Sequence, residues 1–274
     1  MTLTVAVLAS AVLGISLGAL GGGGSILAVP LLVYALDQSP AQATTGSLVV
    51  VGVTSLVGAA AAQHAGRVLL ARGAAFGLVA AGGAVAGARA SAAVPEPMLL
   101  GAFAVLMLIV GTLLAVRQWR GHHAASALPE RSPELDDPII TFSPRFACQC
   151  PRAVKVLVTA TCVGLLTGFL GVGGGFLVVP ALLLALGVPM DLAAGTSLVV
   201  IVITSSVALL ARASSGLDPD WWPVVALTAA AAPGAVVGAR VADRVDTRRL
   251  TAAFTGLVLT VAAYTAVHAL PALT

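Results

Sequence analysis

Long apolar runs and short polar stretches alternate along almost the whole chain. Most of the runs approach the roughly 20 residues that a helix needs to cross a bilayer. Because they are continuous and do not alternate residue by residue, they favour helices over the strands of an outer-membrane barrel. The pattern predicts an all-α polytopic membrane protein. The apolar segments cover residues 3–20, 25–37, 43–63, 72–92 and 97–117 in the first half, and 153–170, 175–187, 193–211, 222–241 and 250–270 in the second.

The composition excludes an ordinary soluble domain. Of the 274 residues, 59% are hydrophobic and 9% are charged, whereas soluble domains carry about 25% charged residues. So few charges cannot cover the surface of a soluble protein of this size. The net charge of +3 is small and the basic residues lie in connecting segments, so we expect no nucleic-acid partner. The three cysteines predict no disulfide framework.

The chain carries an internal repeat. Residues 14–30 read GISLGALGGGGSILAVP and residues 164–180 read GLLTGFLGVGGGFLVVP, so that glycines, a leucine, a valine and a proline recur 150 positions apart. The register continues, because the Ser-Leu-Val-Val of residues 47–50 returns at residues 197–200. The sequence therefore predicts two homologous halves, separated by a polar, proline-rich linker.

Length and charge predict that the two halves have opposite orientations. A single helix over residues 3–37 would be roughly 50 Å long, beyond the hydrocarbon core of about 30 Å. A hairpin with its tip inside the membrane avoids this mismatch and gives five segments in each half. The basic residues then gather on one side, which the positive-inside rule makes cytoplasmic. That side holds Arg67, Arg72, Arg117, Arg120, Arg145, Arg152, Lys155, Arg244, Arg248 and Arg249, and the other holds Arg89, Glu96, Arg212, Asp218 and Asp220.

The predicted fold consists of two inverted-topology repeats of about five helical segments each. Glycine-broken, re-entrant-like hairpins form segments 1–2 and 6–7, and both termini lie outside. The predicted domains are an N-terminal transmembrane repeat over residues 1–118, a cytoplasmic linker over residues 119–152 and a C-terminal transmembrane repeat over residues 153–274.

Four consecutive glycines, Gly21 to Gly24, interrupt the first apolar run. Glycine is about 1 kcal/mol worse than alanine inside a helix, so the block should break it. Broken helices in inverted repeats are typical of secondary transporters. We expect new helices to start near Ser25 and, after the second block, near Phe176, and helix N-termini offer unpaired N–H groups and partial positive charge. Two such termini, brought together by pseudo-symmetry, predict an anion site without a fixed cation.

Hydroxyl residues stand at the expected starts of the third and eighth segments. The stretches 44–47 and 195–197 are expected to be helix N-caps that add O–H donors to the site. Two further roles for the glycines stay open: close helix packing through small residues, and a nucleotide-binding loop, which lacks the βαβ unit that it needs. The predicted substrate-binding residues are Gly21, Gly22, Gly23, Gly24, Ser25, Thr44, Thr45, Gly46, Ser47, Gly173, Gly174, Gly175, Gly195, Thr196 and Ser197.

The doubled motif resembles the TauE/SafE family of membrane permeases. A glycine-rich block, a short apolar stretch and a proline occur in both halves, with Gly-Ala-Arg at residues 87–89 and 238–240, and the resemblance covers nearly the whole chain. It implies transport of sulfur-containing anions such as sulfite, sulfoacetate or related organosulfonates, typically as export from the cytoplasm. The two copies differ, since Ser25 stands where the second copy has Gly175, and Thr45-Gly46 where it has Gly195-Thr196. The site is therefore expected to be asymmetric.

Several polar residues outside these motifs allow two interpretations. Arg89 and Arg240 end their segments on opposite membrane faces, where they either attract anions to the two mouths of the path or anchor the helix ends. His64 either carries a coupling proton or lies at the membrane interface. No Asp or Glu lies in the middle of a predicted span, so coupling would use the charge of the substrate itself.

No metal, cofactor or catalytic site is predicted. Cys148 and Cys150 lie near His122 and His123, but a C-x-C pair in a proline-rich stretch is a weak metal signal. An enzyme would need a charged pair or a Ser/His dyad at the middle of the membrane, and the sequence shows neither. We predict a secondary transporter in the cytoplasmic membrane that exports small sulfur-containing anions; the alternative is a permease for another small solute, a non-sulfur organic anion or a cation. The expected partners are a small anionic substrate and the lipid bilayer; a homodimer is left open.

Overall fold

The described part of the chain consists of helices joined by short connections. The computed structural model describes residues 2–36, 38–91, 94, 96–124, 150–170, 175–213, 221–242 and 244–269. The first half comprises α1 (Thr2–Leu20), the 3₁₀ helix η1 (Gly21–Leu27), the single turn α2 (Ala28–Pro30), the π-helical turn η2 (Leu31–Ala35), α3 (Pro40–His64), α4 (Leu70–Ser91) and α5 (Glu96–Ala124). The second half comprises α6 (Cys150–Leu170), α7 (Gly175–Ala185), α8 (Met190–Ala213), α9 (Trp221–Ala242) and α10 (Thr247–Ala269).

The surface of the helices suits a bilayer. Large apolar side chains such as Leu8, Leu78 and Leu210 stay exposed on it, and a soluble protein rarely exposes so much apolar area. Four described helices are long and apolar enough to cross a membrane, namely Gln42–His64, Leu70–Ser91, Met190–Arg212 and Trp221–Ala242. The predicted all-α multi-pass membrane fold is confirmed.

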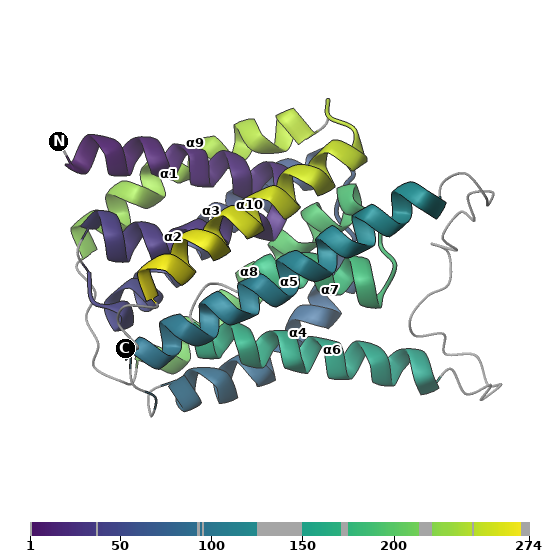
Figure 1. The fold of residues 1–274 in the computed structure, drawn as a ribbon, viewed down its shortest axis with the longest axis horizontal. Coiled ribbons are helices and arrows are strands. Elements are labelled where there is room, and N and C mark those ends of the chain that lie inside the picture. Colours follow the sequence, from purple (N-terminus) through teal and green to yellow (C-terminus); the bar gives the residue numbers. More distant parts are fainter. Residues whose placement is uncertain are drawn as a thin grey trace.

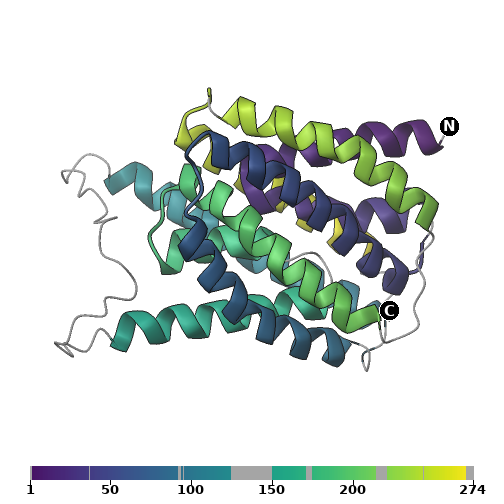
Figure 2. The same ribbon diagram turned by 180° about the vertical axis from the view of Figure 1, so that it is seen from behind.

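The helices pair across the two halves of the chain. Helix α1 lies along α9 at the upper edge of Figure 1, and α4 lies along α6 at the lower edge. Helices α5 and α10 lie side by side across the near face, while Figure 2 shows α3 and α8 side by side on the opposite face. The first break is the 3₁₀ helix η1, which contacts α10 as well as α3 and α8. Helix α7, which follows the second break, contacts α5 and α8. They therefore lie between the α5–α10 pair and the α3–α8 pair.

Glycines allow the two edge pairs to approach backbone to backbone. A Cβ on Gly14 of α1 would overlap the carbonyl group of Ala231 in α9, and a Cβ on Gly164 of α6 would overlap that of Ala80 in α4. The next turns repeat this arrangement, with Gly18 against Ala235 and Gly168 against Ala84. Residue numbers rise together along both pairs, so the paired helices run parallel. Such small-residue contacts are how membrane helices pack closely.

The central helices α3 and α8 run antiparallel. Gly52 faces Ser205 and Gly58 faces Leu198, so residue numbers rise along one helix as they fall along the other. Inverted repeats would place equivalent helices in this way. They would also pair α1 with a helix of the second half and α6 with a helix of the first half, as the α1–α9 and α4–α6 pairs do. The inverted repeat stays a prediction, and these reciprocal contacts support it.

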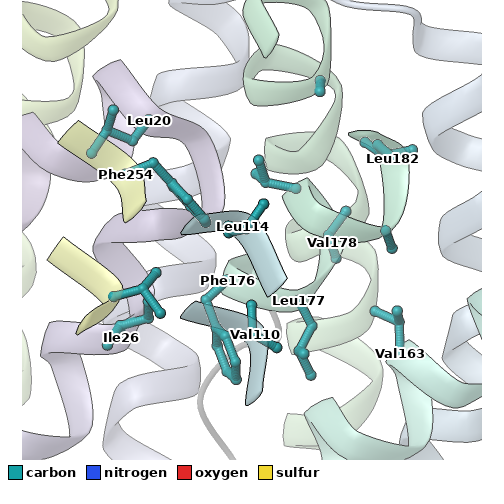
Figure 3. Close-up of a cluster of buried hydrophobic side chains, with 14 of the residues drawn as sticks. Leu20, Ile26, Val110, Leu114, Val163, Phe176, Leu177, Val178, Leu182 and Phe254 are labelled. Atoms are coloured by element: carbon teal, nitrogen blue, oxygen red, sulfur yellow. The ribbon is translucent and has the colours of Figure 1, made fainter. Parts of the chain in front are cut away.

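An apolar cluster fills one side of the breaks. Ile26 of η1 and Phe176 of α7 are fully buried and point into the same cluster as Val110 of α5 and Phe254 of α10 (Figure 3). The side of the breaks that faces α5 and α10 is therefore apolar. Polar groups that could meet a substrate lie on the opposite side, toward α3 and α8.

Candidate functional site

The first glycine-rich break reverses the direction of the chain. Gly21 adopts a φ of +65°, a left-handed conformation that glycine favours. Gly24 then lies against the backbone of Leu17 in α1, so the chain folds back along α1 as a hairpin requires. The glycines themselves form the 3₁₀ helix η1, which begins at Gly21 and contains Gly23. The prediction that a helix begins near Ser25 is therefore wrong, because the tighter 3₁₀ turn accommodates the glycines.

Hydrogen bonds hold this break against α8. The backbone N–H of Gly22 donates to Oγ of Ser197 at 3.2 Å, and the Ser197 hydroxyl donates to the carbonyl of Ala194 at 2.7 Å. The Ser25 hydroxyl donates to the carbonyl of Gly22 at 2.6 Å. Ser25 and Ser197 are fully buried. Three of the predicted site residues thus form one small polar cluster.

The two breaks touch each other. A Cβ on Gly22 would overlap the carbonyl group of Gly175, and a Cβ on Gly175 would lie 2.6 Å from both Cα of Gly22 and Cδ1 of Ile201. Close packing, one of the roles left open for the glycines, therefore accounts for these two. Gly173 and Gly174 lie outside the described residues.

The predicted N-caps lie inside their helices. Helix α3 begins at Pro40 with Ser39 as its N-cap, and α8 begins at Met190 directly after Pro189. Proline suits the start of a helix because its φ is fixed and it needs no hydrogen-bond acceptor. The prediction that residues 44–47 and 195–197 open these helices is therefore wrong by about one turn.

The hydroxyls of α3 nevertheless lie in a buried polar environment. Thr44 and Thr45 are buried, and the Ser47 hydroxyl donates to the carbonyl of Thr44 at 2.9 Å. Gly46 lies on another side of the helix, where a Cβ would approach Val224 of α9. Residues 44–47 therefore do not all face one site.

At the opposite end of the α3–α8 pair, two predicted residues hold a loop. The Leu69 N–H donates to Oγ1 of Thr196 at 3.0 Å, and Gly195 lies against the carbonyl of Arg67. The Arg67 guanidinium donates to the carbonyl of Ala239 at 2.6 Å. Gly195 and Thr196 thus fix the α3–α4 connection in this structure.

A buried arginine lies beside Thr44. Arg212, near the end of α8, donates to Oγ1 of Thr44 at 3.0 Å, to Oγ of Ser91 at 3.0 Å and to the carbonyl of Gly168 at 3.2 Å. All three partners are neutral oxygens, and the Nε–H has no partner among the described residues. The ion pair between Arg249 and Asp246 lies elsewhere, and both of its side chains are exposed.

Arg212 differs from every other charged side chain whose burial the structure describes. It is 7% exposed, and it is the only charged residue in the described buried set. The sequence pattern did not reveal it, because an arginine at the end of an apolar run usually extends to the membrane surface. The repeat offered one signal, since the equivalent position in the first half is Ala62.

Comparison with known proteins decides the family. The family model described as "Sulfite exporter TauE/SafE" matches residues 6–265. The chain belongs to the TauE/SafE family. A probable membrane transporter protein of Xylella fastidiosa (strain 9a5c) is 31% identical over 266 residues, covering 96% of this chain and 94% of the relative. Another, from strain Temecula1 / ATCC 700964, is 33% identical over 201 residues, covering 73% of this chain and 70% of the relative. No solved structure gives a significant match.

Membership of TauE/SafE makes the chain a membrane transporter of the multi-pass type and not an enzyme. Among the described residues, no three His, Cys, Asp or Glu side chains gather as a metal site would require. Cys148 lies outside the described residues. His64 is exposed at the end of α3, with Nδ1 2.7 Å from the carbonyl of Ala60 in its own helix.

The two arginines of the Gly-Ala-Arg motifs lie at opposite ends of this TauE/SafE chain. Arg89 precedes Ser91, which contacts Arg212 near the start of α3, whereas Arg240 follows Ala239, which contacts Arg67 beyond the end of α3. Both side chains are exposed. This placement agrees with either interpretation, an access residue or an anchor of the helix end.

Proposed function

We propose that this TauE/SafE transporter is a secondary carrier that exports small sulfur-containing anions, such as sulfite, sulfoacetate or other organosulfonates. The substrate would bind between the two glycine-rich breaks, on the side of η1 that faces α3 and α8. The family description supports a sulfur oxyanion, and the names of both relatives support a transporter.

One observation carries the choice of an anion. The only described buried charge is the Arg212 guanidinium, and the described buried set contains no Asp or Glu. A cation in this low-dielectric environment would be repelled by Arg212, whereas an anion would gain a charge-assisted hydrogen bond. The planar guanidinium also matches the oxygen geometry of an oxyanion. A cationic substrate, one of the alternatives from the sequence, is therefore disfavoured, while a non-sulfur organic anion stays the second candidate.

Arg212 is arranged so that it can exchange partners. Its hydroxyl partners, Thr44 and Ser91, accept hydrogen bonds from the guanidinium, and the Ser91 hydroxyl donates to the carbonyl of Ala88 at 2.9 Å. An anion would therefore take over guanidinium N–H groups that now point at neutral oxygens. Because no carboxylate has to be displaced, an arriving anion competes only with neutral oxygens, which form weaker bonds to a cation than a charged group does.

Export would follow the membrane potential. An anion that leaves a cell with a negative interior gains about 2.3 kcal/mol per charge per 100 mV. Transport could then proceed without a co-ion, which agrees with the lack of buried carboxylates among the described residues. Transporters with inverted repeats commonly alternate access by moving one helix bundle against another around a fixed site. The breaks lie between the α5–α10 pair and the α3–α8 pair, where such a movement would act on a bound substrate.

Transport of defined anions by the purified protein tests the proposal. Proteoliposomes would be given sulfite, sulfoacetate, sulfate and acetate, each with an imposed membrane potential. We expect saturable flux of sulfite or sulfoacetate, with sulfate and acetate slower. Equal, slow flux of all four would contradict the sulfur-anion assignment, and saturable flux of acetate alone would favour the non-sulfur anion.

A further inference from the structure

We propose a second oxyanion site near the centre of the membrane, where α3 crosses α8, formed by the hydroxyl groups of Thr54, Ser55 and Ser205. These three groups are called the central hydroxyls below. The inference rests on the proposed function, and it names the place where the transported anion pauses between the two faces of the membrane.

The central hydroxyls lie at the middle of both helices. A Cβ built on Gly52 would lie 3.4 Å from Cβ of Ser205, so Ser205 faces α3 directly. Ser55 lies three residues after Gly52, on the same face of α3 and about 4.5 Å further along the helix. Thr54 precedes Ser55 at nearly the same height, about 100° around the helix, so it borders this face from the side. Helix α3 covers residues 40–64 and α8 covers residues 190–213, so these positions are far from either helix end.

The central hydroxyls differ from the remaining hydroxyls of the bundle because they have no hydrogen-bond partner. Thr54 and Ser55 are 0% exposed and Ser205 is 1% exposed, and none of their oxygens has a partner among the described residues. Elsewhere a membrane-helix hydroxyl donates to a carbonyl one turn earlier in its own helix. Thr112, Thr159, Thr167, Thr204, Ser206, Thr228, Thr255 and Thr260 all do so.

Packing alone does not account for these side chains. Leaving a buried hydroxyl unsatisfied is costly, and native proteins keep few such groups without a ligand or water that bonds to them. Alanine would occupy nearly the same space as serine without this cost. Unsatisfied hydroxyls on the facing sides of two crossing helices, Ser55 and Ser205, with Thr54 beside them, therefore point to a ligand that accepts hydrogen bonds from them.

The position of the site along α8 points to the transported anion. Ser197, Ser205 and Arg212 fall within about 80° of one another around α8, since eight residues correspond to about 2.2 helical turns and fifteen to about 4.2. Ser197 contacts the first break and Arg212 contacts Thr44. Ser205 lies about 12 Å from the first and about 10 Å from the second along the helix axis. The central hydroxyls thus form a step between the breaks and the buried cation.

Three O–H donors without a carboxylate suit an oxyanion. A sulfur oxyanion carries several acceptor oxygens, and each hydroxyl can donate one hydrogen bond. The described buried residues contribute no carboxylate that would hold a cation there. A sodium ion held by the same oxygens is the competing outcome that the experiment has to separate.

The test compares single substitutions with a matched control in proteoliposomes given sulfite and sulfoacetate. Thr54→Val, Ser55→Ala and Ser205→Ala should each raise the half-saturating anion concentration about tenfold, the loss of one hydrogen bond to a charged group. Thr204→Val is the control, because the Thr204 hydroxyl already donates within its own helix to Val200 and Ile201. It should leave half-saturation unchanged.

A second readout uses thermal unfolding in detergent. Without anion, the Ser55→Ala and Ser205→Ala proteins should unfold at the same temperature as the wild type or higher, because an unsatisfied hydroxyl has been removed. The rise in Tm caused by sulfite should shrink in both. If one variant does not insert, the other carries the same expectation from the facing helix.

The outcomes separate the two proposals. Wild-type transport of sulfite with unchanged half-saturation in all three variants overturns the central site and leaves the proposed function standing. A wild type that carries neither anion overturns both. If sodium chloride raises the Tm of the wild type but not of the variants, while half-saturation by the anions is unchanged, the hydroxyls bind a cation and the oxyanion assignment is overturned.

Discussion

Arg212 is surrounded by the C-terminal ends of three helices. It lies next to the last residue of α8, and its partners Ser91 and Gly168 lie at or near the ends of α4 and α6. The C-terminal end of a helix carries a partial negative charge, which stabilises a nearby cation. The guanidinium can therefore stay charged without a carboxylate. An ion pair would have neutralised the charge that the proposed function needs.

Replacing Arg212 should weaken anion transport in a graded way. Arg212→Gln is expected to raise half-saturation by sulfite about 10- to 100-fold, since hydrogen bonds to charged groups contribute about 1.5–3 kcal/mol each. Arg212→Lys should lie between the glutamine variant and the wild type, because it keeps the charge and loses the planar fork. Flux as a function of sulfite concentration measures both.

Arg249→Gln serves as the control, because this side chain is 82% exposed at the start of α10. A lower Tm for Arg212→Gln with unchanged half-saturation would assign Arg212 a purely structural role.

Gly22 should not tolerate any side chain. In Gly22→Ala the new methyl group would overlap the Gly175 carbonyl, and overpacking of this kind costs about 1–3 kcal/mol. Gly82→Ala on α4 is the matched control, because no atom lies within 4 Å of its Cβ position and alanine favours a helix by about 1 kcal/mol. The unfolding temperature should fall for the first and stay level or rise for the second. Equal unfolding temperatures would contradict the close contact of the breaks.

Sequence patterns predict residue types at the breaks better than they predict partners. The repeat points to the doubled glycines and Ser197, and Ser25 follows the first glycine block; Gly22, Ser25 and Ser197 do meet. It does not point to Arg212, because the surroundings of Arg212 are formed by residues of α3, α4 and α6, which lie far from it in the sequence. The repeat also marks its glycines mainly as breaks, although Gly14 and Gly164 lie inside helices and allow them to pack closely.

At the scale of elements, apolar runs predict the helices well. The predicted segments 43–63 and 222–241 correspond to α3 (Pro40–His64) and α9 (Trp221–Ala242). The predicted starts of α3 and α8 fall about one turn too late because they follow the apolar runs, whereas the helices start at Pro40 and directly after Pro189. The pairing of α1 with α9 and of α4 with α6 could not be predicted, since periodicity gives the apolar face of a helix and not its neighbour.

The reciprocal helix pairs predict equal sensitivity to equivalent substitutions. Gly14→Ala would disturb the α1–α9 contact at Ala231, and Gly164→Ala would disturb the α4–α6 contact at Ala80. We expect the two changes in unfolding free energy to agree within about 1 kcal/mol, each within the range of about 1–3 kcal/mol for overpacking. Thermal unfolding in detergent measures them.

Gly256→Ala on α10 should keep or slightly raise stability, because its Cβ position has no neighbour within 4 Å and alanine favours a helix over glycine. Strong destabilisation by only one of the two paired substitutions would contradict the equivalence of the pairs.

At the scale of the whole molecule, the inverted repeat predicts where each connection lies. With five segments in each half, both termini are outside and the linker is cytoplasmic. In a Cys162→Ser protein, Cys148 and Cys150 should react with a membrane-impermeant maleimide in inside-out vesicles and not in right-side-out vesicles. Cys162 is removed because it is exposed on α6. Labelling from the outside would contradict the topology without affecting the helix pairing.

The exchange of helices between the halves also sets an order for assembly in the membrane. Helix α1 ends at residue 20, whereas its neighbour α9 begins at residue 221, so synthesis at 5–20 residues per second separates them by about 10–40 s. During this interval the glycine-lined face of α1 has no partner of its own and must rest against lipid or the insertion machinery. Helix α4 waits a shorter time, because α6 begins at residue 150. A nascent chain therefore buries its first helix only when its penultimate helix arrives, which makes that late contact a natural point for the cell to recognise incomplete chains.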